Sequence, residues 1–318
     1  MELVIALVAL IVGVLILGYG ADMFVGGASH IARRFGIPPV VIGLTVVAFG
    51  TSAPEMAVNI LAAIQGNSGI AYGNVVGSNT FNVLVILGIC AIVKPLSVGS
   101  QLIRIDIPLM AVAAAILWWF SQDGSLGRIE STVLFALLLA YIALQVRLSL
   151  KERNATKEEF AQEFNEGGPV WKNILFLVIG LVLLIAGAKM FVHGAVTLAQ
   201  LWGVSEQVIA LTIVSAGTSL PEVATSIAAT MKGEREIAVG NVVGSNIFNI
   251  LAVLGISGLL APSPIIADAA MRGIDLPIML LTCVALAPLA KFRGKFERPV
   301  GVIFLAGYIA YTVHLIYR

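Results

Sequence analysis

Residues Gly43–Glu55, GLTVVAFGTSAPE, place a carboxylate inside a stretch of otherwise apolar and small residues. An ionisable side chain at membrane depth is costly, and it usually faces the interior of a helix bundle or a water-filled cavity, where it serves function. Pro54 has no backbone N–H and its ring crowds the preceding turn, so a helix that begins near Val40 must break or kink here. The break frees backbone carbonyl oxygens beside the acid. The stretch therefore predicts a buried site with carboxylate and carbonyl ligands.

The same pattern recurs at Ala210–Glu222, ALTIVSAGTSLPE, 167 residues further along the chain. At this offset more than half of the positions in Gly20–Ile89 are identical to those in Gly187–Ile256, without a gap. Chance does not produce such agreement, whereas an internal duplication does. The chain thus carries two copies of one site.

The composition is that of a membrane protein. Hydrophobic residues make up 59% of the 318 residues and charged residues only 12%, with a mean hydropathy of +0.99, whereas soluble domains are about 25% charged. The net charge of +1 gives no reason to expect nucleic acid as a partner. Cys90 and Cys283 lie in apolar runs without metal-ligand spacing, so we interpret them as buried thiols.

About 20 apolar residues cross a membrane as a helix, and the chain offers ten such stretches. They lie near residues 3–27, 38–64, 70–93, 103–121, 128–148, 173–198, 206–231, 236–260, 272–290 and 298–316. The prediction is an all-α membrane protein with a five-helix repeat at 1–150, a charged cytoplasmic linker at 151–172 and a second five-helix repeat at 173–318. Because five is odd, the second copy enters the membrane from the opposite side. The ten transmembrane helices then form two inverted repeats with helices 2 and 7 broken, as in many secondary transporters.

Basic residues predict the orientation, because they are enriched in cytoplasmic loops. With the N-terminus outside, fifteen Lys and Arg residues fall in inner loops or the linker and four fall outside. Both termini of this multi-pass protein of the cell membrane are therefore predicted to be extracytoplasmic. Asp22 and Lys189 occupy equivalent positions near the outer ends of helices 1 and 6. We interpret both as side chains that snorkel to the membrane surface, with an acidic vestibule at Asp22 as the alternative.

A second duplicated block, Gly73–Asn82 (GNVVGSNTFN) and Gly240–Asn249 (GNVVGSNIFN), supplies further oxygen atoms. In each copy two Asn residues and one Ser follow a four-residue step, so their side chains share one helix face, which we expect to look at the broken helix. The four motif blocks contain no Lys, Arg, His or Cys. Hard oxygen ligands suit Ca²⁺ and Na⁺ rather than zinc or copper. The alternative for these Asn and Ser residues is hydrogen bonding between helices.

GTSAPE with GNVVGSNTFN, repeated as GTSLPE with GNVVGSNIFN, resembles the paired alpha-repeats of the cation/calcium exchanger superfamily, and most closely its prokaryotic sodium/calcium exchangers. The resemblance implies a Ca²⁺ site formed by Glu55 and Glu222 with the main-chain carbonyls of Thr51 and Thr218. It likewise implies Na⁺ sites from a set of hydroxyls and carbonyls, namely those of Ser52, Ser78, Ser219 and Ser245 and the carbonyls of Ala48 and Ser215. It also implies that helices 1 and 6 slide across the core to alternate access.

Two positions depart from the pattern of the superfamily. Some relatives carry Asp where Asn249 stands, and in potassium-dependent exchangers an acidic residue there is tied to the K⁺ requirement. Asn at both Asn82 and Asn249, which we keep among the candidate ligands, therefore implies independence of K⁺. Ser215 stands where Ala is common, which matters only if its hydroxyl reaches the ion.

Charge arithmetic predicts the transport reaction. Two carboxylates at close range repel, so the empty site attracts cations or protons. One Ca²⁺ neutralises the pair and three Na⁺ leave one positive charge in excess, which predicts electrogenic antiport of three Na⁺ for one Ca²⁺. We expect Ca²⁺, Na⁺ and membrane lipid as partners, no cofactor and a monomeric protein.

Other functions fit the residues less well. The nearest alternative is a Ca²⁺/H⁺ exchanger, in which the two glutamates carry protons, and a cation channel is another. An intramembrane hydrolase with Ser52 or Ser219 as nucleophile lacks a base, because no His lies in the motif blocks. Asp106 and Asp275, in the matching IDIP and IDLP stretches, are expected to cap their helices.

Overall fold

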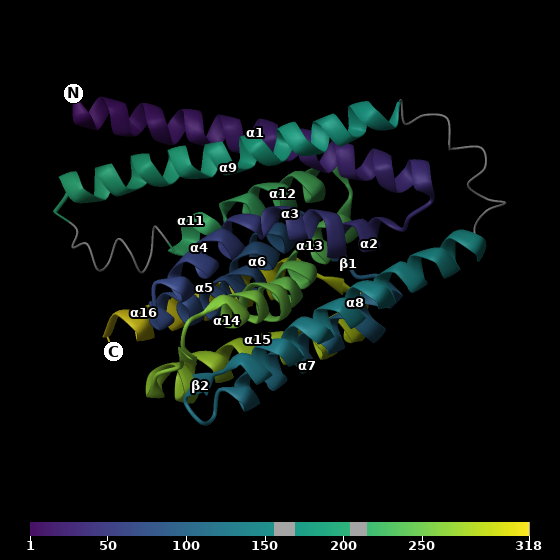
Figure 1. Cartoon of the computed structure of the whole chain (residues 1–318). Helices are drawn as coiled ribbons and strands as arrows, with labels where there is room; N and C mark the ends of the chain where they lie inside the picture. The colour runs from purple at the N-terminus through teal and green to yellow at the C-terminus, as the bar shows by residue number, and fades with distance from the viewer. Residues whose placement is uncertain (156–168, 204–214, 318) are drawn as a thin grey trace.

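The computed structural model describes residues 1–155, 169–203 and 215–317, most of them helical (Figure 1). The helices of the first half are α1 (Glu2–Phe35), α2 (Pro39–Ile42), α3 (Ala48–Thr51), α4 (Ala53–Ile64), α5 (Ser68–Phe81), α6 (Leu87–Val93), α7 (Ile107–Phe120) and α8 (Arg128–Ala155). Those of the second half are α9 (Val170–Leu201), α11 (Ser215–Thr218), α12 (Leu220–Lys232), α13 (Arg235–Phe248), α14 (Gly255–Leu260), α15 (Leu276–Arg293) and α16 (Arg298–Tyr317). Short π-helical segments join or precede several of them, at Gly43–Val47, Asn82–Ile86, Leu102–Asp106, Asn249–Leu254 and Met271–Asp275.

Eight helices of the described residues are long and apolar enough to cross a membrane, and the bent pair Pro39–Thr51 and Ala53–Ile64 makes a ninth. The expected seventh span, 206–231, begins within 204–214, which lies outside the described residues, and α12 forms its remainder. Ten spans in two inverted repeats therefore stay a prediction. The first and sixth helices are longer than expected, at 34 and 32 residues. At about 1.5 Å per residue they exceed the hydrocarbon core, so each must tilt or extend beyond it.

Both copies of the motif break the helix at the same position. Ser52 leaves helical geometry with φ −82° and ψ 4°, and the helical parts on its two sides meet at 47°. Ser219 does the same with φ −88° and ψ 5°. Pro54 and Pro221 follow in the first turns of α4 and α12, where a missing N–H is tolerated. Each proline leaves the carbonyl four residues earlier without its helical donor.

The two long helices α1 and α9 lie side by side across one face of the molecule (Figure 1). Glycines at every seventh position line their contact, at 13, 20 and 27 in α1 and at 180, 187 and 194 in α9. A Cβ at Gly20 would lie 2.9 Å from the backbone nitrogen of Leu184, and one at Gly187 would lie 2.8 Å from that of Leu17. Because side chains would not fit here, glycine allows the two backbones to approach closely and form one packed pair.

Four strands of two residues each, which the all-α prediction did not include, tie the two halves together. β1 (Leu96–Ser97) pairs antiparallel with β4 (Lys295–Phe296), and β2 (Ser125–Leu126) pairs antiparallel with β3 (Ile265–Ile266). β1 precedes α7 and β2 follows it, so the two ladders lie at opposite ends of that helix. Helix α13, in which every residue from Ile237 to Phe248 is buried, packs against β1 and α7.

Candidate cation-binding site

Glu55 and Glu222 lie in the first turns of α4 and α12, directly after the two helix breaks. Their side chains are buried, at 1% and 0% exposure. Ser219 Oγ donates a hydrogen bond to Glu55 Oε1 over 3.3 Å, and Ser52 Oγ donates to Glu222 Oε1 over 3.1 Å. Each acid is thus held by the serine of the other copy. Because each of these bonds crosses between the copies, the two acids belong to one buried cluster.

The motif threonines reach across the same boundary. Thr51 Oγ1 donates to Asn241 Oδ1 over 3.2 Å, and Thr218 Oγ1 donates to Asn74 Oδ1 over 3.4 Å. The amide nitrogens of both asparagines donate in turn to side chains of the segments after the breaks. Since both ends of each amide are in use, Asn74 and Asn241 join the two copies of the site.

Sequence reasoning missed the acceptors of those amides, Asn59 and Ser226. Asn59 Oδ1 accepts from Asn74 Nδ2 over 2.7 Å, and Ser226 Oγ accepts from Asn241 Nδ2 over 2.9 Å. Both are fully buried, at 0% exposure. A signal for them exists, because each lies four residues after its glutamate at an equivalent position of the duplication and therefore shares its helix face.

The second blocks of the two copies meet face to face. Asn79 Nδ2 donates to the Asn246 carbonyl over 3.2 Å, and Asn246 Nδ2 donates to the Asn79 carbonyl over 3.1 Å. Asn82 Nδ2 donates to Asn246 Oδ1 over 3.0 Å, and Asn249 Nδ2 donates to Asn79 Oδ1 over 3.1 Å. Asn79 and Asn246 therefore link the helices.

Five of the expected ligand side chains carry a buried oxygen that has no hydrogen-bond partner in the described part of the chain. These atoms are Glu55 Oε2, Glu222 Oε2, Asn82 Oδ1, Asn249 Oδ1 and Ser245 Oγ. Of the other such atoms, Thr225 Oγ1 lies on α12 one turn after Glu222, whereas Ser29 Oγ and Ser257 Oγ lie on other helices. An unpaired buried oxygen is costly, so several in equivalent motifs suit a cation that supplies the missing interaction. The described ranges hold no group of three or more His, Cys, Asp or Glu placed for a metal, so a divalent ion here also needs neutral oxygens.

The remaining candidate ligands adjoin this cluster where the structure describes them. Ser78 Oγ lies 3.2 Å from Ser219 Oγ, within hydrogen-bonding distance. The Ala48 carbonyl accepts from Ser52 N–H over 3.0 Å and from a threonine hydroxyl over 3.3 Å. Ser215 begins α11, and its side chain lies outside the described set. The ligand roles of all these residues stay predictions.

Asp106 and Asp275 do not cap their helices, so that expectation was wrong. Neither makes a side-chain capping hydrogen bond. Asp106 is fully buried and accepts from Gln145 Nε2 over 2.6 Å and from Gln101 Nε2 over 3.1 Å. Asp275 accepts from the Tyr311 hydroxyl over 3.2 Å. Each acid instead ties the fourth helix of its half to the last one, because both helices continue through the expected cap as a π-helical segment.

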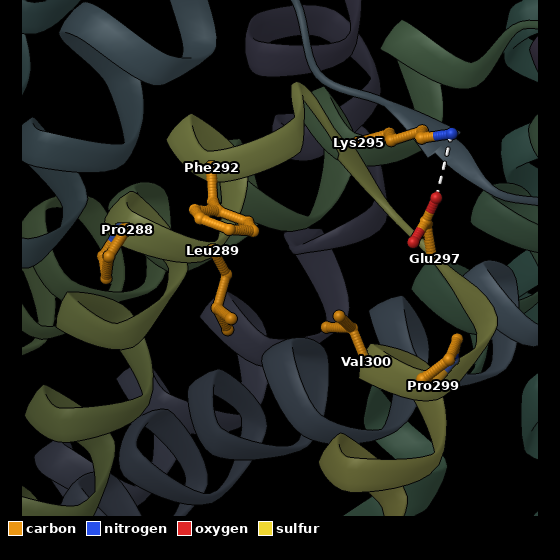
Figure 2. Close-up of a pocket in the computed structure, with 7 residues that line it drawn as sticks. All are labelled: Pro288, Leu289, Phe292, Lys295, Glu297, Pro299 and Val300. Carbon is orange, nitrogen blue, oxygen red and sulfur yellow. Dashed lines mark ion pairs between the residues drawn. The ribbon is translucent and has the colours of Figure 1, made fainter.

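A cavity of about 430 Å³ lies at the corner between α15, β4 and α16, and it shares no residue with the cluster (Figure 2). Its lining is Pro288, Leu289, Phe292, Lys295, Glu297, Pro299 and Val300. The two charged residues pair with each other over 2.9 Å. An apolar lining with one internally neutralised pair does not suit a dehydrated cation, so this cavity is not the candidate site.

Comparison with known proteins gives one consistent result. The family described as sodium/calcium exchanger protein matches residues 5–147 and 172–317. The putative antiporter CaxA of Alkalimonas amylolytica is 40% identical over 97% of this chain and 98% of its own. The sodium/calcium exchanger MaX1 of Methanosarcina acetivorans is 32% identical over 97% of each chain. A structure of the sodium-calcium exchanger NCX_Mj, soaked with 10 mM Na⁺ and 10 mM Sr²⁺, superposes with a TM-score of 0.84 at 31% identity over 98% of both chains.

Proposed function

The chain belongs to the sodium/calcium exchanger family, and on that premise we propose that it exchanges three Na⁺ for one Ca²⁺ across the cell membrane by alternating access. It is a membrane-spanning cation/Ca²⁺ antiporter and not an enzyme. Ca²⁺ and Na⁺ are its cargo rather than cofactors.

The observation that carries the proposal is the set of buried, unpartnered oxygens on both glutamates and on Asn82, Asn249 and Ser245. We assign Ca²⁺ to the two glutamates with the carbonyls of Thr51 and Thr218. The Na⁺ sites are assigned to the neighbouring hydroxyls and carbonyls, those of Ser52, Ser78, Ser219, Ser245, Ala48 and Ser215. Since Ca²⁺ takes 6–8 oxygens, neutral ligands or water complete its shell.

The charge of the cluster supports electrogenic exchange. With both glutamates ionised and the asparagines neutral, the ligand set carries two negative charges. One Ca²⁺ balances them, and three Na⁺ exceed them by one, so each cycle moves one net charge across the membrane. A membrane potential then contributes about 2.3 kcal/mol per 100 mV to each cycle.

The asparagines support independence of K⁺. Asn82 and Asn249 each use the amide nitrogen to bond the opposite copy, over 3.0 and 3.1 Å, which fixes the amide oxygen as the atom left for a cation. A neutral oxygen adds no third charge for a further monovalent ion to balance. The exchange therefore needs no K⁺ to reach neutrality with Ca²⁺.

We also propose that the chain forms two inverted five-helix repeats with both termini extracytoplasmic, acting as a monomer. Two contacts support the proposal that the loops rich in Lys and Arg lie together at one end of the molecule, the cytoplasmic end. Arg33 pairs with Glu234 over 2.6 Å, and Lys94 Nζ donates to the Met231 carbonyl over 3.1 Å. They join the ends of three loops that the distribution of basic residues places on the same side of the membrane. Helices α8 and α9 reach into the predicted linker of 151–172, because α8 extends to Ala155 and α9 begins at Val170.

The test is Ca²⁺ flux in proteoliposomes under imposed Na⁺, K⁺ or pH gradients, with the membrane potential clamped. We expect an outward Na⁺ gradient to drive Ca²⁺ uptake, a K⁺ gradient to have no effect beyond the potential, and inside-negative potential to slow uptake of Ca²⁺. Glu55→Gln and Glu222→Gln serve as inactive controls. Uptake that follows the pH gradient and ignores Na⁺ would instead identify a Ca²⁺/H⁺ exchanger.

A further inference from the structure

Two ion pairs join α1 to the turn between α12 and α13. Lys232 Nζ lies 2.7 Å from Asp22 Oδ1 and donates to the Asp22 carbonyl over 2.8 Å. Further along α1, Arg33 pairs with Glu234 over 2.6 Å. The sequence-based interpretation placed Asp22 near the outer end of its helix. Its pair with Lys232 instead places Asp22 toward the basic end, and α1 continues beyond it to Phe35. These four residues, Asp22, Lys232, Arg33 and Glu234, are called the latch below.

The duplication supplies no second latch. At the offset of 167, the positions equivalent to Asp22, Lys232, Arg33 and Glu234 hold Lys189, Gln65, Gln200 and Asn67. The first equivalent pair joins a cation to an amide and the second joins two amides. Neither can form an ion pair, so the opposite end of the molecule lacks the electrostatic contacts that hold the basic end.

The packing of the helices has the same asymmetry. α1 packs along α12, whereas its duplicate α9 makes no comparable contact with α4, the duplicate of α12, among the described residues. The glycine-lined contact keeps α1 and α9 together, so the pair acts as one body against the broken helices. In this structure that body is closed onto the basic end and not onto the other.

From these observations we propose that the latch biases the access equilibrium of the antiporter toward the conformation closed at the basic end, and that the lack of a counterpart makes the two access states unequal. The inference rests on the proposed antiport, since only alternating access requires α1 to leave α12. The latch side chains are partly exposed, with Asp22 at 63% and Arg33 at 59%. Pairs of this kind are individually weak and sensitive to salt, so the bias is modest and reversible in each cycle.

The test measures Ca²⁺/Ca²⁺ self-exchange in proteoliposomes of uniform orientation, which needs no Na⁺ and so remains valid if the Na⁺ coupling fails. The readout is the ratio of the half-saturating Ca²⁺ concentrations at the two faces, because an apparent affinity falls with the population of the state that binds. For Asp22→Asn we expect a change of about two- to fivefold in this ratio toward tighter binding at the basic face. Molar salt should reduce the difference between variant and parent.

Two further variants make the test specific. The charge swap Asp22→Lys with Lys232→Asp should restore the parental ratio, which loss of folding or packing would not do. Gln65→Glu, at the position equivalent to Lys232, should pair with Lys189 when the other end is closed, and should therefore shift the ratio in the same direction as Asp22→Asn. The proposal is overturned if Asp22→Asn leaves the ratio unchanged, or if Asp22→Asn and Gln65→Glu shift it in opposite directions.

Discussion

Replacement of Glu55 by Gln removes one of two buried negative charges while keeping nearly the same shape. The carboxylate is 1% exposed, accepts one hydrogen bond from Ser219 and leaves its second oxygen without a partner. The amide can still accept from Ser219 through its oxygen. What changes is the charge offered to a cation at Oε2, so the variant separates electrostatic binding from packing.

The expected magnitude follows from the burial of Glu55, which forms a pair of opposite charges with a bound Ca²⁺. Removing one partner of a buried charge pair costs about 3–5 kcal/mol, and each 1.4 kcal/mol is a factor of ten in a dissociation constant. The Ca²⁺ dissociation constant should therefore rise by about 100- to 3,000-fold. Glu222→Gln should give a similar loss, since Glu222 is equally buried and holds an equivalent bond from Ser52.

Thermal unfolding in detergent, with and without Ca²⁺, tests both the direction and the size of the expected change in stability. In the absence of metal ions the parent buries two carboxylates that repel each other when both are ionised and that bind a proton only at a cost relative to the unfolded chain, so each variant should unfold at the same temperature or higher. At a Ca²⁺ concentration of 100 times the parental dissociation constant, the parent gains about 2.7 kcal/mol and the variants gain almost nothing. The exposed Glu2→Gln is the control and should behave as the parent.

Two outcomes would refute the account. A Glu55→Gln variant that binds Ca²⁺ within tenfold of the parent would show that the charge is not a ligand. A difference of more than tenfold between Glu55→Gln and Glu222→Gln would show that the two copies do not share one site on equal terms. Calorimetric titration with Ca²⁺ measures both quantities directly.

Three more expectations follow from the same contacts. Ser52→Ala and Ser219→Ala each leave a glutamate oxygen without its donor, and because such a bond contributes about 1 kcal/mol, we expect the Na⁺ concentration for half-maximal exchange to change about fivefold, measured by Na⁺-dependent Ca²⁺ flux. Asn249→Asp adds a third buried charge that one Ca²⁺ cannot balance, so transport should acquire a dependence on K⁺ or on pH, and flux that still ignores both would contradict the charge arithmetic. Gly187→Ala puts a Cβ 2.8 Å from a backbone nitrogen of α1, so overpacking should lower stability by about 1–3 kcal/mol in thermal unfolding, whereas Gly18→Ala, with nothing within 4 Å, should not.

The duplicated motifs make much of the site predictable from the amino-acid sequence. Glu55 and Glu222 stand out because acids are rare in apolar stretches, and each proline next to them marks where the helix breaks. The offset of 167 then implies that whatever one copy contacts, the other contacts in exchange. This reasoning predicts a cluster from both halves, and the structure brings Ser52 to Glu222 and Ser219 to Glu55.

Other features depend on geometry that no periodic pattern encodes. Which asparagine faces its counterpart depends on the rotation of each helix about its axis, so the sequence did not show that Asn79 and Asn246 bond each other across the two copies. Asp106 precedes Pro108 in the manner of a capping residue, yet the helix continues past it as a π-helical segment and its carboxylate turns to Gln145. The ion pair of Asp22 with Lys232 joins side chains on separate elements whose distance only the folded chain defines.

The exchange of bonds between Asn79 and Asn246 has a consequence for how this chain can vary. Each side chain donates to the carbonyl of its own counterpart, which makes the contact self-complementary, like the isologous interface of a twofold dimer. Such a contact could join two separate half-chains as well as the two halves of one chain. A substitution of Asn79 removes the donor to the Asn246 carbonyl and the Oδ1 that accepts from Asn249, and a substitution of Asn246 removes the equivalent pair of bonds. Both positions are therefore constrained together, even though one covalent chain could otherwise let its halves diverge.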